Sequence, residues 1–320
     1  MRVPRAALIG AGAIAPFHAD ALKSAGFELR HIAASPGSSR AKTLAKIKGF
    51  DQVWESSEDL ISSGDWDCLV LATNTESTIE LLSLASRRDQ PCLVEKPVAF
   101  DVRSLEVFPE PNSNIRVAYN RRFYSSVQRA REFAREGACT FRMELPDTIG
   151  NETEMFAGLR AVRENSVHGL DLLAFVIGRY QLEAIERVKD GSRRSRIALV
   201  KSDEGHLGTI VLNWNCPANF SLVLDQAPRR LELRPFELAS VYEGMEILEP
   251  TAEIPVRRYM PRKITETSSF PGPDGIKPGF LGQAQSLWRK VTEGEWEDGT
   301  ATLSDARFAI ETAVTLIGAE

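Results

Sequence analysis

The stretch that decides the fold reads AALIGAGAIA and spans residues 6–15. It opens with small apolar residues, as in a buried strand, and a helical pattern from about Ile14 to Ala25 follows directly. The turn between them has the form G-x-G-x-x-A, in which Gly10 permits a tight turn and Gly12 lets the backbone approach a ligand. The sequence therefore predicts a strand–turn–helix unit of the kind that binds dinucleotides.

A helix that begins directly after such a turn offers a site for a pyrophosphate. Its first N–H groups have no partner within the helix, and its dipole is positive at this end. A tight glycine turn without any ligand is the alternative, because the hexapeptide alone is a weak signal. The predicted pyrophosphate-binding residues are Gly10, Gly12, Ala13 and Ile14.

The residues after the second predicted strand, 29–34, bear on the choice between NAD and NADP. An acidic side chain at this point binds the ribose hydroxyls of NAD and repels a 2′-phosphate. Here the chain continues as SPGSSR, residues 35–40, which contains no carboxylate. Ser35 and Arg40 could hold a 2′-phosphate, so the sequence slightly favours NADP over NAD. Arg40 could equally be a solvated residue in the first turn of the next helix.

Apolar runs and helical patterns continue to alternate through the first third of the chain. Further strands are predicted at residues 53–54, 68–73, 92–95 and 115–119, and helices at 39–48, 57–62 and 78–88. Strands rich in Val, Leu and Ile that alternate with helices are typical of a parallel sheet covered on both faces. We therefore predict a Rossmann domain over residues 1–122.

The rest of the chain, residues 123–320, shows a different pattern. Helices are predicted at residues 125–135, 167–177, 280–292 and 303–317. A strand is predicted at 139–145, and successive strands are predicted between about 182 and 242. Residues 250–278 are predicted to form one long loop. Strands that follow one another across short turns indicate an antiparallel sheet. The predicted fold class is α/β, with the N-terminal Rossmann parallel sheet followed by an α+β domain with a large, mostly antiparallel sheet. This second domain would bind substrate, and its helices from about residue 280 could pack back on the first domain.

Composition and cysteine usage exclude several classes of partner. A net charge of −5 argues against nucleic acid, because phosphate binding needs a concentrated cationic surface. No apolar run reaches the roughly 18 residues of a membrane span, and the chain does not open with a signal peptide, so we expect a cytoplasmic protein. The cysteines are widely separated, and His18, His31 and His206 have no metal-ligand spacing, so we predict no metal site.

Five further motifs lie along the chain. They are ATN at residues 72–74, EKP at 95–97, NRRF at 120–123, E-x-S-x-H-x-x-D at 164–171 and LSDA at 303–306. Together with the opening turn, these motifs resemble, in this order, those of the Gfo/Idh/MocA family of oxidoreductases. The resemblance implies a domain that binds NAD(P) and a second domain whose sheet often forms the oligomer interface, so we expect a homodimer or homotetramer. It also implies a substrate that is a sugar, a cyclic polyol or a nucleotide sugar.

The resemblance carries site residues over to this sequence. The residues that border the cofactor would be Thr73, Asn74, Glu95 and Lys96. Asp171, Arg121 and Arg122 are the predicted substrate-binding residues, although the two arginines could instead contact a phosphate of the cofactor, or one of them could bridge the domains. The sequence departs from the family at Glu164, Ser166 and Ser125, where the family often has Asp, Gly and Pro.

Lys96 and His168 are the predicted proton-transfer groups. Hydride transfer to a carbonyl makes an alkoxide, so a proton donor must stand beside the reacting oxygen. Lys96 follows a parallel strand at its carboxyl end, where ligands bind in open α/β sheets, although a surface pair with Glu95 is the alternative. His168 and Asp171 share one face of an otherwise apolar helix, where they face a cleft or a satisfied partner in the core. Glu164 completes the predicted catalytic set.

The predicted function is hydride transfer between NAD(P) and a hydroxyl or keto carbon of a sugar, cyclic polyol or nucleotide sugar. A redox-neutral NAD-dependent enzyme that cleaves glycosidic bonds is one alternative. A non-enzymatic sensor that binds a dinucleotide is another, but a sensor has no need of the proton-transfer groups Lys96 and His168.

Overall fold

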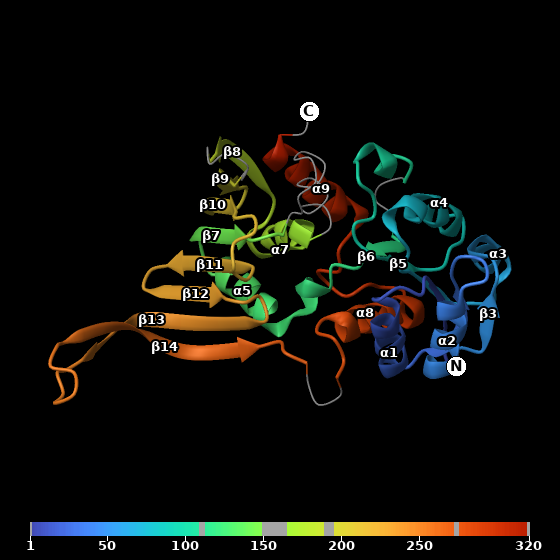
Figure 1. Cartoon of the computed structure of the whole chain (residues 1–320), viewed down its shortest axis with the longest axis horizontal. Helices are drawn as coiled ribbons and strands as arrows, with labels where there is room; N and C mark the ends of the chain where they lie inside the picture. Colours follow the sequence, from blue (N-terminus) through green and yellow to red (C-terminus); the bar gives the residue numbers. More distant parts are fainter. Residues whose placement is uncertain (1, 109–112, 149–164, 189–194, 272–274, 319–320) are drawn as a thin grey trace. The chain divides into compact units, whose positions relative to one another are not determined.

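A computed structural model describes residues 2–108, 113–148, 165–188, 195–271 and 275–318 of the chain (Figure 1). Its contacts divide the chain into two compact units, Met1–Phe123 with Pro271–Val314 and Tyr124–Phe270 with Thr315–Glu320. The first boundary falls one residue after the predicted domain boundary. Residues 271–314 belong to the first unit although they follow the main segment of the second unit in sequence.

The first unit contains a sheet of six parallel strands in the order β3-β2-β1-β4-β5-β6. The strands are β1 (Arg5–Ile9), β2 (Glu28–Ala33), β3 (Gln52–Trp54), β4 (Cys68–Leu71), β5 (Cys92–Val94) and β6 (Ile115–Val117). The direction in which strands are added reverses between β1 and β4. In open sheets of this kind, ligands bind in the crevice at that reversal, beyond the carboxyl ends of the strands. The predicted Rossmann architecture is confirmed.

Helices connect these strands or follow the last of them. They are α1 (Ala15–Ala25), α2 (Ser39–Lys48), α3 (Ser57–Ser63), α4 (Thr75–Ala85), the 3-10 helices η1 (Arg103–Leu105) and η2 (Asn120–Phe123), and later α8 (Phe280–Glu293) and α9 (Leu303–Ile317). Helix α4 begins before its predicted start at residue 78. The reason is that the Asn74 side chain caps it by accepting a hydrogen bond from the Ser77 N–H at 3.3 Å.

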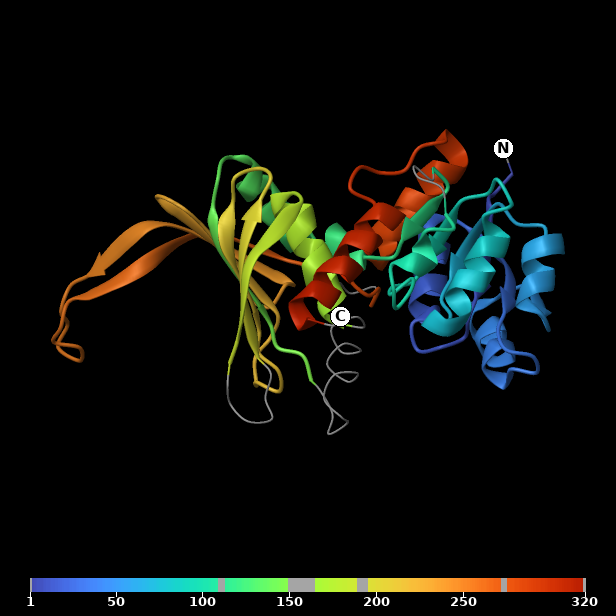
Figure 2. The same ribbon diagram turned by 90° about the horizontal axis from the view of Figure 1, so that it is seen from above.

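Helix α8 packs beside α1 on the parallel sheet, although their sequences lie far apart (Figure 2). Phe280 and Leu287 of α8 share one buried core with Leu8 of β1 and Leu22 of α1. The ring of Trp288 lies against Gly26, where a Cβ would stand 3.2 Å from the indole. The first unit therefore takes part of its core from the C-terminal region of the chain.

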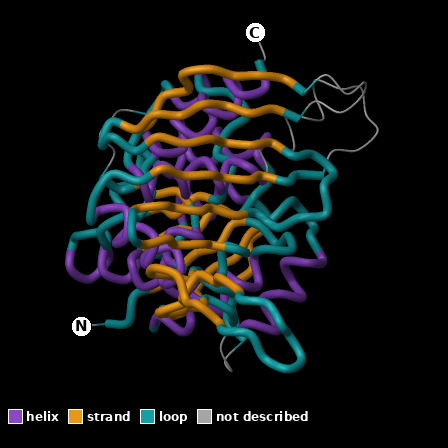
Figure 3. Tube along the Cα trace, turned by 90° about the vertical axis from the view of Figure 1, so that its left-hand side faces the viewer, coloured by secondary structure: helices purple, strands orange, loops and turns teal. Residues whose placement is uncertain are grey.

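The second unit is built on an eight-stranded sheet in the order β14-β13-β12-β11-β7-β10-β9-β8 (Figure 3). The strands are β7 (Thr140–Leu145), β8 (Tyr180–Arg187), β9 (Arg196–Ser202), β10 (Leu207–Leu212), β11 (Ser221–Gln226), β12 (Arg229–Leu233), β13 (Leu238–Leu248) and β14 (Arg258–Ser268). Only β7 and β10 pair in parallel among the described strands of this sheet. The predicted large, mostly antiparallel sheet is confirmed.

Two helices of the second unit, α5 (Ser125–Arg135) and α7 (Val167–Ile177), pack against each other. Gly169 lets α7 approach the sheet closely, since a Cβ there would lie 2.4 Å from the Leu145 side chain of β7. Phe141 and Met143 of β7 are buried, whereas the alternate residues on the strand are more exposed. The sheet therefore has one face that forms the core and one that is open to solvent within this unit.

The prediction of one long loop over residues 250–278 is wrong, because Arg258–Ser268 forms strand β14. This strand is at the edge of the sheet, pairs only with β13 and is exposed along nearly its whole length. It therefore lacks the alternation of buried and exposed residues that would reveal a strand in the sequence. Pro261 has no backbone N–H to donate. It is tolerated here because the N–H groups on the outer side of an edge strand have no neighbouring strand to bind.

Candidate functional site

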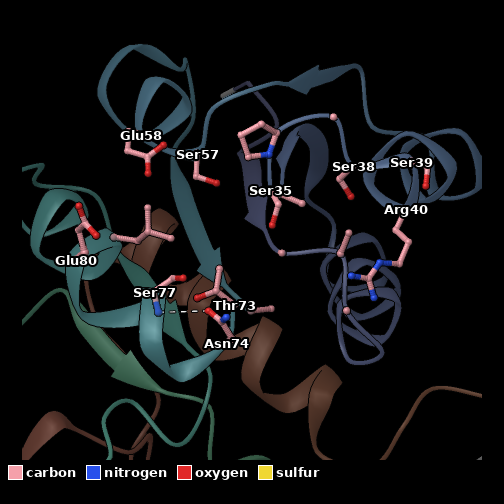
Figure 4. Close-up of a pocket in the computed structure, with 18 residues that line it drawn as sticks. Ser35, Ser38, Ser39, Arg40, Ser57, Glu58, Thr73, Asn74, Ser77 and Glu80 are labelled. Carbon is pink, nitrogen blue, oxygen red and sulfur yellow. Dashed lines mark hydrogen bonds between the residues drawn. The ribbon is translucent and has the colours of Figure 1, made fainter.

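A cavity of about 750 Å³ lies in the first unit at the carboxyl ends of β1, β2 and β4 (Figure 4). Its walls come from the glycine turn after β1, from residues 34–40 after β2 and from residues 72–81 after β4, with a contribution from the start of α3. The predicted dinucleotide-binding residues that line it are Gly10, Gly12, Ser35, Arg40, Thr73 and Asn74. The cavity thus occupies the crevice expected at the reversal of strand order.

Positions 10 and 12 of the turn favour glycine for different structural reasons. Gly10 has a φ of +112° and donates its N–H to the Ala33 carbonyl at 2.8 Å. A Cβ on Gly10 would lie 2.1 Å from the Ala72 carbonyl oxygen, so no larger residue fits there. A Cβ on Gly12 would meet no heavy atom within 4 Å. Gly10 is therefore required by the turn itself, whereas Gly12 leaves room beside the backbone for a ligand.

Ala13 and Ile14 lead the turn into α1 and do not line the cavity. Ile14 occupies the N-cap position, and its aliphatic side chain has no group that could accept the N–H groups of the first turn. The first turn also contains no acidic side chain. This helix end therefore suits an anion, which would supply the missing acceptor and the negative charge.

The wall after β2 carries hydroxyl groups and a guanidinium. Ser35 and Arg40 are exposed there, whereas the Ser38 hydroxyl caps α2 by accepting from the Ala41 N–H at 3.3 Å. Glu55, just after β3, accepts the Gly37 N–H at 3.0 Å and pairs with Lys42 at 3.2 Å. The Gly37 hydrogen bond and then Lys42 lower the pKa of the Glu55 carboxyl. The Glu55 carboxylate is therefore already engaged by the loop and by α2, whereas Glu58 and Glu80 line the cavity.

The wall after β4 is held by a short network of hydroxyl and amide groups. The Thr73 and Thr78 hydroxyls are 3.0 Å apart, and Thr78 donates to the Asn74 carbonyl at 2.9 Å. The Asn74 side chain caps α4 (Figure 4). These contacts fix Thr73 and Asn74 at the cavity wall.

Glu95 and Lys96 directly follow β5, the neighbour of β4. The Glu95 N–H donates to the Leu71 carbonyl at 2.8 Å, which extends the pairing of β5 with β4 by one residue. One Glu95 carboxylate oxygen lies 2.7 Å from His18 Nε2, and the other accepts the Lys96 N–H at 3.1 Å. The Lys96–Pro97 peptide bond is cis. The Glu95 side chain is thus directed toward α1 and toward the backbone of Lys96.

The two arginines of the NRRF motif differ in their surroundings. Arg122 is buried and donates to the Gly299 carbonyl at 3.1 Å, and it lies 3.4 Å from Asp305 of the LSDA motif. Arg121 is more exposed than Arg122. Arg122 is therefore engaged within the first unit, and a contact of either arginine with substrate stays a prediction.

His168 and Asp171 lie on α7 in the second unit, where Asp171 is buried and His168 is partly exposed. Asp147 fixes the start of this helix, since it accepts a hydrogen bond from Asn165 Nδ2 at 3.1 Å and another from the Ser166 hydroxyl. Glu164 lies outside the described residues. Because Lys96 belongs to the first unit and His168 to the second, their convergence on one substrate stays a prediction.

Sequence reasoning missed three residues that the structure connects to these segments: His18, Glu55 and Asp147. A signal existed for His18, because Ala15, His18, Ala19 and Leu22 follow the spacing of one buried helix face. Glu55 and Asp147 act through contacts distant in sequence and left no local signal. Within the described residues no cluster of His, Cys, Asp and Glu could hold a metal, and no helix could span a membrane.

Comparison with known proteins gives a family for the N-terminal part. Residues 4–108 match the model of GFO_IDH_MocA, described as an oxidoreductase family with an NAD-binding Rossmann fold. No curated protein matches the chain by sequence.

Several solved structures share the fold over nearly the whole chain at low sequence identity. A levoglucosan dehydrogenase in complex with NADH and levoglucosan has a TM-score of 0.74 at 14% identity, over 99% of this chain and 97% of its own. UDP-N-acetylglucosamine 3-dehydrogenase from Acidithiobacillus ferrooxidans has a TM-score of 0.73 at 14% identity, over 100% and 98%. Myo-inositol dehydrogenase from Lactobacillus casei, in complex with NAD(H) and myo-inositol, has a TM-score of 0.68 at 15% identity, over 98% and 93%.

Proposed function

Because the N-terminal domain of this chain belongs to the Gfo/Idh/MocA family of oxidoreductases, we propose that the protein is an NAD(P)-dependent enzyme of this kind. It transfers a hydride between NAD(P) and a hydroxyl or keto carbon of a sugar, cyclic polyol or nucleotide sugar. The observation that carries this proposal is the cavity beside the open backbone of Gly12, at the start of a helix suited to an anion. The names of the three dehydrogenases of similar fold support the substrate class.

The residues around the cavity fit a dinucleotide. The turn at Gly10 and Gly12 would bind the pyrophosphate, and Thr73 and Asn74 would border the cofactor on the other side. We favour NADP, because Ser35 and Arg40 line the cavity after β2 and could hold a 2′-phosphate, and because Glu55 is held by Gly37 and Lys42. Arg is well matched to a phosphate, since its planar donors can bind two oxygens at once.

In this proposal the bound nicotinamide supplies or accepts the hydride, and the protein supplies geometry and protons. Lys96 gives a proton to the reacting oxygen and removes it in the reverse direction. His168 exchanges a proton with the same or a neighbouring hydroxyl, and Asp171 orients the imidazole or binds a hydroxyl. Glu164 stays in the proposed catalytic set, and Arg121 is the proposed contact to a substrate phosphate.

We also propose that the protein is a homodimer or homotetramer. Residues 244–262, here called the arm, extend β13 and β14 beyond the end of β12 as a two-stranded hairpin (Figures 1 and 2). An isolated two-stranded hairpin is marginally stable in water, so a partner that covers the arm would stabilise it. A second copy of the chain is the proposed partner.

The direct test is a fluorescence titration of the purified protein with NADPH and with NADH, followed by a screen of sugars, polyols and nucleotide sugars for cofactor turnover. The expected result is saturable binding, tighter for NADPH, and turnover with at least one compound of these classes. Binding of neither cofactor would exclude the proposed function. Binding with no net turnover, and with cofactor retained through purification, would favour the redox-neutral alternative.

A further inference from the structure

A buried pair links the helix after the glycine turn to the end of β5. His18 Nε2 of α1 lies 2.7 Å from Glu95 Oε1, and the side chains are 3% and 12% exposed. A hydrogen bond to an imidazole so far removed from water is costly to leave unmade, because the ring cannot turn to solvent instead. The pair therefore fixes both side chains in one arrangement.

The imidazole is also held from its other side. The ring of Phe280 on α8 packs against it with a centroid separation of 4.8 Å. Phe280 is itself buried in the core shared by α1 and α8. His18 therefore has little freedom to follow Glu95 if Glu95 moves, so it acts as the fixed member of the pair.

Glu95 passes this constraint to the next residue. Its second carboxylate oxygen, Oε2, accepts the backbone N–H of Lys96 at 3.1 Å. One oxygen is thus committed to the imidazole and the other to the Lys96 backbone. The direction in which the Lys96 side chain leaves the strand end depends on both contacts.

We propose that His18 is a positioning residue, which acts through Glu95 to aim the Lys96 amine at the reacting oxygen of the substrate. This inference rests on the proposed function for the role of Lys96. The same helix begins at the turn that would hold the pyrophosphate, so His18 couples the position of the cofactor to that of the proton donor. A lysine that is misplaced by about 1 Å loses on the order of a hundredfold in rate, since proton transfer requires close contact.

The proposal predicts the behaviour of Lys96 without any cofactor. If His18 is replaced by leucine, Glu95 Oε1 loses the imidazole, so the Glu95 carboxylate no longer holds the Lys96 backbone in one arrangement. The rate at which an amine is acylated depends on its exposure and on the charges around it, so the rate changes when the side chain moves. In His18→Gln the amide nitrogen stands close to the position of Nε2 and can still donate to Glu95.

The experiment compares wild type, His18→Leu, His18→Gln and the control Leu22→Val, a core change on the same helix. The first measurement is the rate at which Lys96 is acylated in the apoprotein, by mass spectrometry, with the exposed Lys201 as internal reference. We expect the labelling rate of Lys96 to change at least about threefold in His18→Leu alone, with Lys201 unchanged. The second measurement is kcat and NADPH affinity, where we expect kcat to fall about tenfold to a hundredfold in His18→Leu at nearly constant Kd, and to recover in His18→Gln.

Two results would overturn the positioning role. One is labelling of Lys96 in His18→Leu at the wild-type rate, and the other is an equal loss of kcat in His18→Gln and His18→Leu. If Leu22→Val reproduces the effects of His18→Leu, they arise from helix packing and the role is likewise excluded. A wild-type protein that binds neither cofactor would defeat the proposed function instead, and the labelling measurement would still report on the link from His18 to Lys96.

Discussion

Arg122 of the NRRF motif and Asp305 of the LSDA motif form an ion pair at 3.4 Å, although they are far apart in sequence. Their side chains are only 7% and 20% exposed. Asp305 also accepts hydrogen bonds from the Thr302 N–H at 2.8 Å and the Thr302 hydroxyl at 2.9 Å, which fixes the start of α9. Two motifs that lie far apart in sequence are therefore parts of one structural connection.

Removing one partner of this pair leaves the other buried without its counter-charge. We expect Asp305→Ala to lower the free energy of unfolding by about 2–3 kcal/mol, measured by chemical denaturation. The matched control is Glu293→Ala, which breaks the exposed pair of Arg289 and Glu293 at 3.1 Å. That change should cost less than about 0.5 kcal/mol. Equal effects of the two substitutions would contradict a structural role for the buried pair.

The two glycines of the turn should respond differently to alanine. In Gly10→Ala the new methyl would overlap the Ala72 carbonyl at a φ of +112°, so we expect a loss of about 2 kcal/mol or more in unfolding free energy. In Gly12→Ala the methyl enters open space, so stability should change by less than about 0.5 kcal/mol. NADPH affinity should nevertheless fall about tenfold or more in Gly12→Ala, because the methyl occupies the approach to the backbone. Wild-type affinity in that variant would remove the pyrophosphate from this turn.

The choice of cofactor should depend on Arg40. We expect Arg40→Ala to raise the Kd for NADPH about tenfold or more and to leave the Kd for NADH nearly unchanged, because only NADPH loses a charged hydrogen bond. Fluorescence titration of both cofactors measures this. Lys46→Ala is the control, since Lys46 is an exposed cation on the same helix that does not line the cavity. An equal loss for both cofactors would show that Arg40 does not recognise the 2′-phosphate.

The elements predicted best from the sequence are buried ones whose pattern lies within a few neighbouring residues. Strand β4 consists of four fully buried apolar residues, Cys68–Leu71, and its pattern was sufficient to place it. Strand β14 was missed, because an exposed edge strand has no buried face to impose a periodicity. The second sheet could be predicted as antiparallel from its short turns, but not the parallel pairing of β7 with β10, which joins strands distant in sequence.

The same distinction applies to the candidate site. The glycine turn was predictable, because its constraints lie within a few neighbouring residues. The pairing of His18 with Glu95 was not, because it joins residues 77 positions apart, one on α1 and one directly after β5. Tertiary structure decides whether a polar group on an apolar helix meets a partner or a cleft. At the start of α7, for example, the Ser166 hydroxyl donates to Asp147, which lies 19 positions away in sequence.

The proposed proton donor can be removed with little change in shape. We expect Lys96→Met to lower kcat by about 10²- to 10⁴-fold, because methionine keeps a long side chain but cannot donate a proton. The Kd for NADPH should stay within a few-fold of wild type, since the pyrophosphate and adenosine contacts lie on other strands. Steady-state kinetics and fluorescence titration on the same preparation give both values. Turnover at the wild-type rate would exclude Lys96 from the proton transfer.

The arm should determine the oligomeric state. Met245 and Ile247 of β13 stand opposite Pro261 and Tyr259 of β14, so all four side chains lie on one face of the hairpin. Met245, Ile247 and Tyr259 are 58%, 53% and 61% exposed, which is an apolar surface of the kind that marks an interface. Pro261 on the edge strand disfavours the addition of another strand there, so a partner would cover the face.

The apolar face of the arm suits a second copy of the chain. A two-fold axis along the arm would place β13 of one copy over β14 of the other, so that the exposed Met245, Ile247 and Tyr259 side chains of the two copies meet. We therefore expect Ile247→Glu to convert the oligomer into a smaller species in light scattering after size-exclusion chromatography, without loss of thermal stability in the monomeric fold. Ile47→Glu, a change at a residue 68% exposed in the first unit, should keep the wild-type mass. A monomeric wild-type protein at micromolar concentration, or an unchanged mass for Ile247→Glu, would contradict this role, because the apolar face would then be stable in water without a partner.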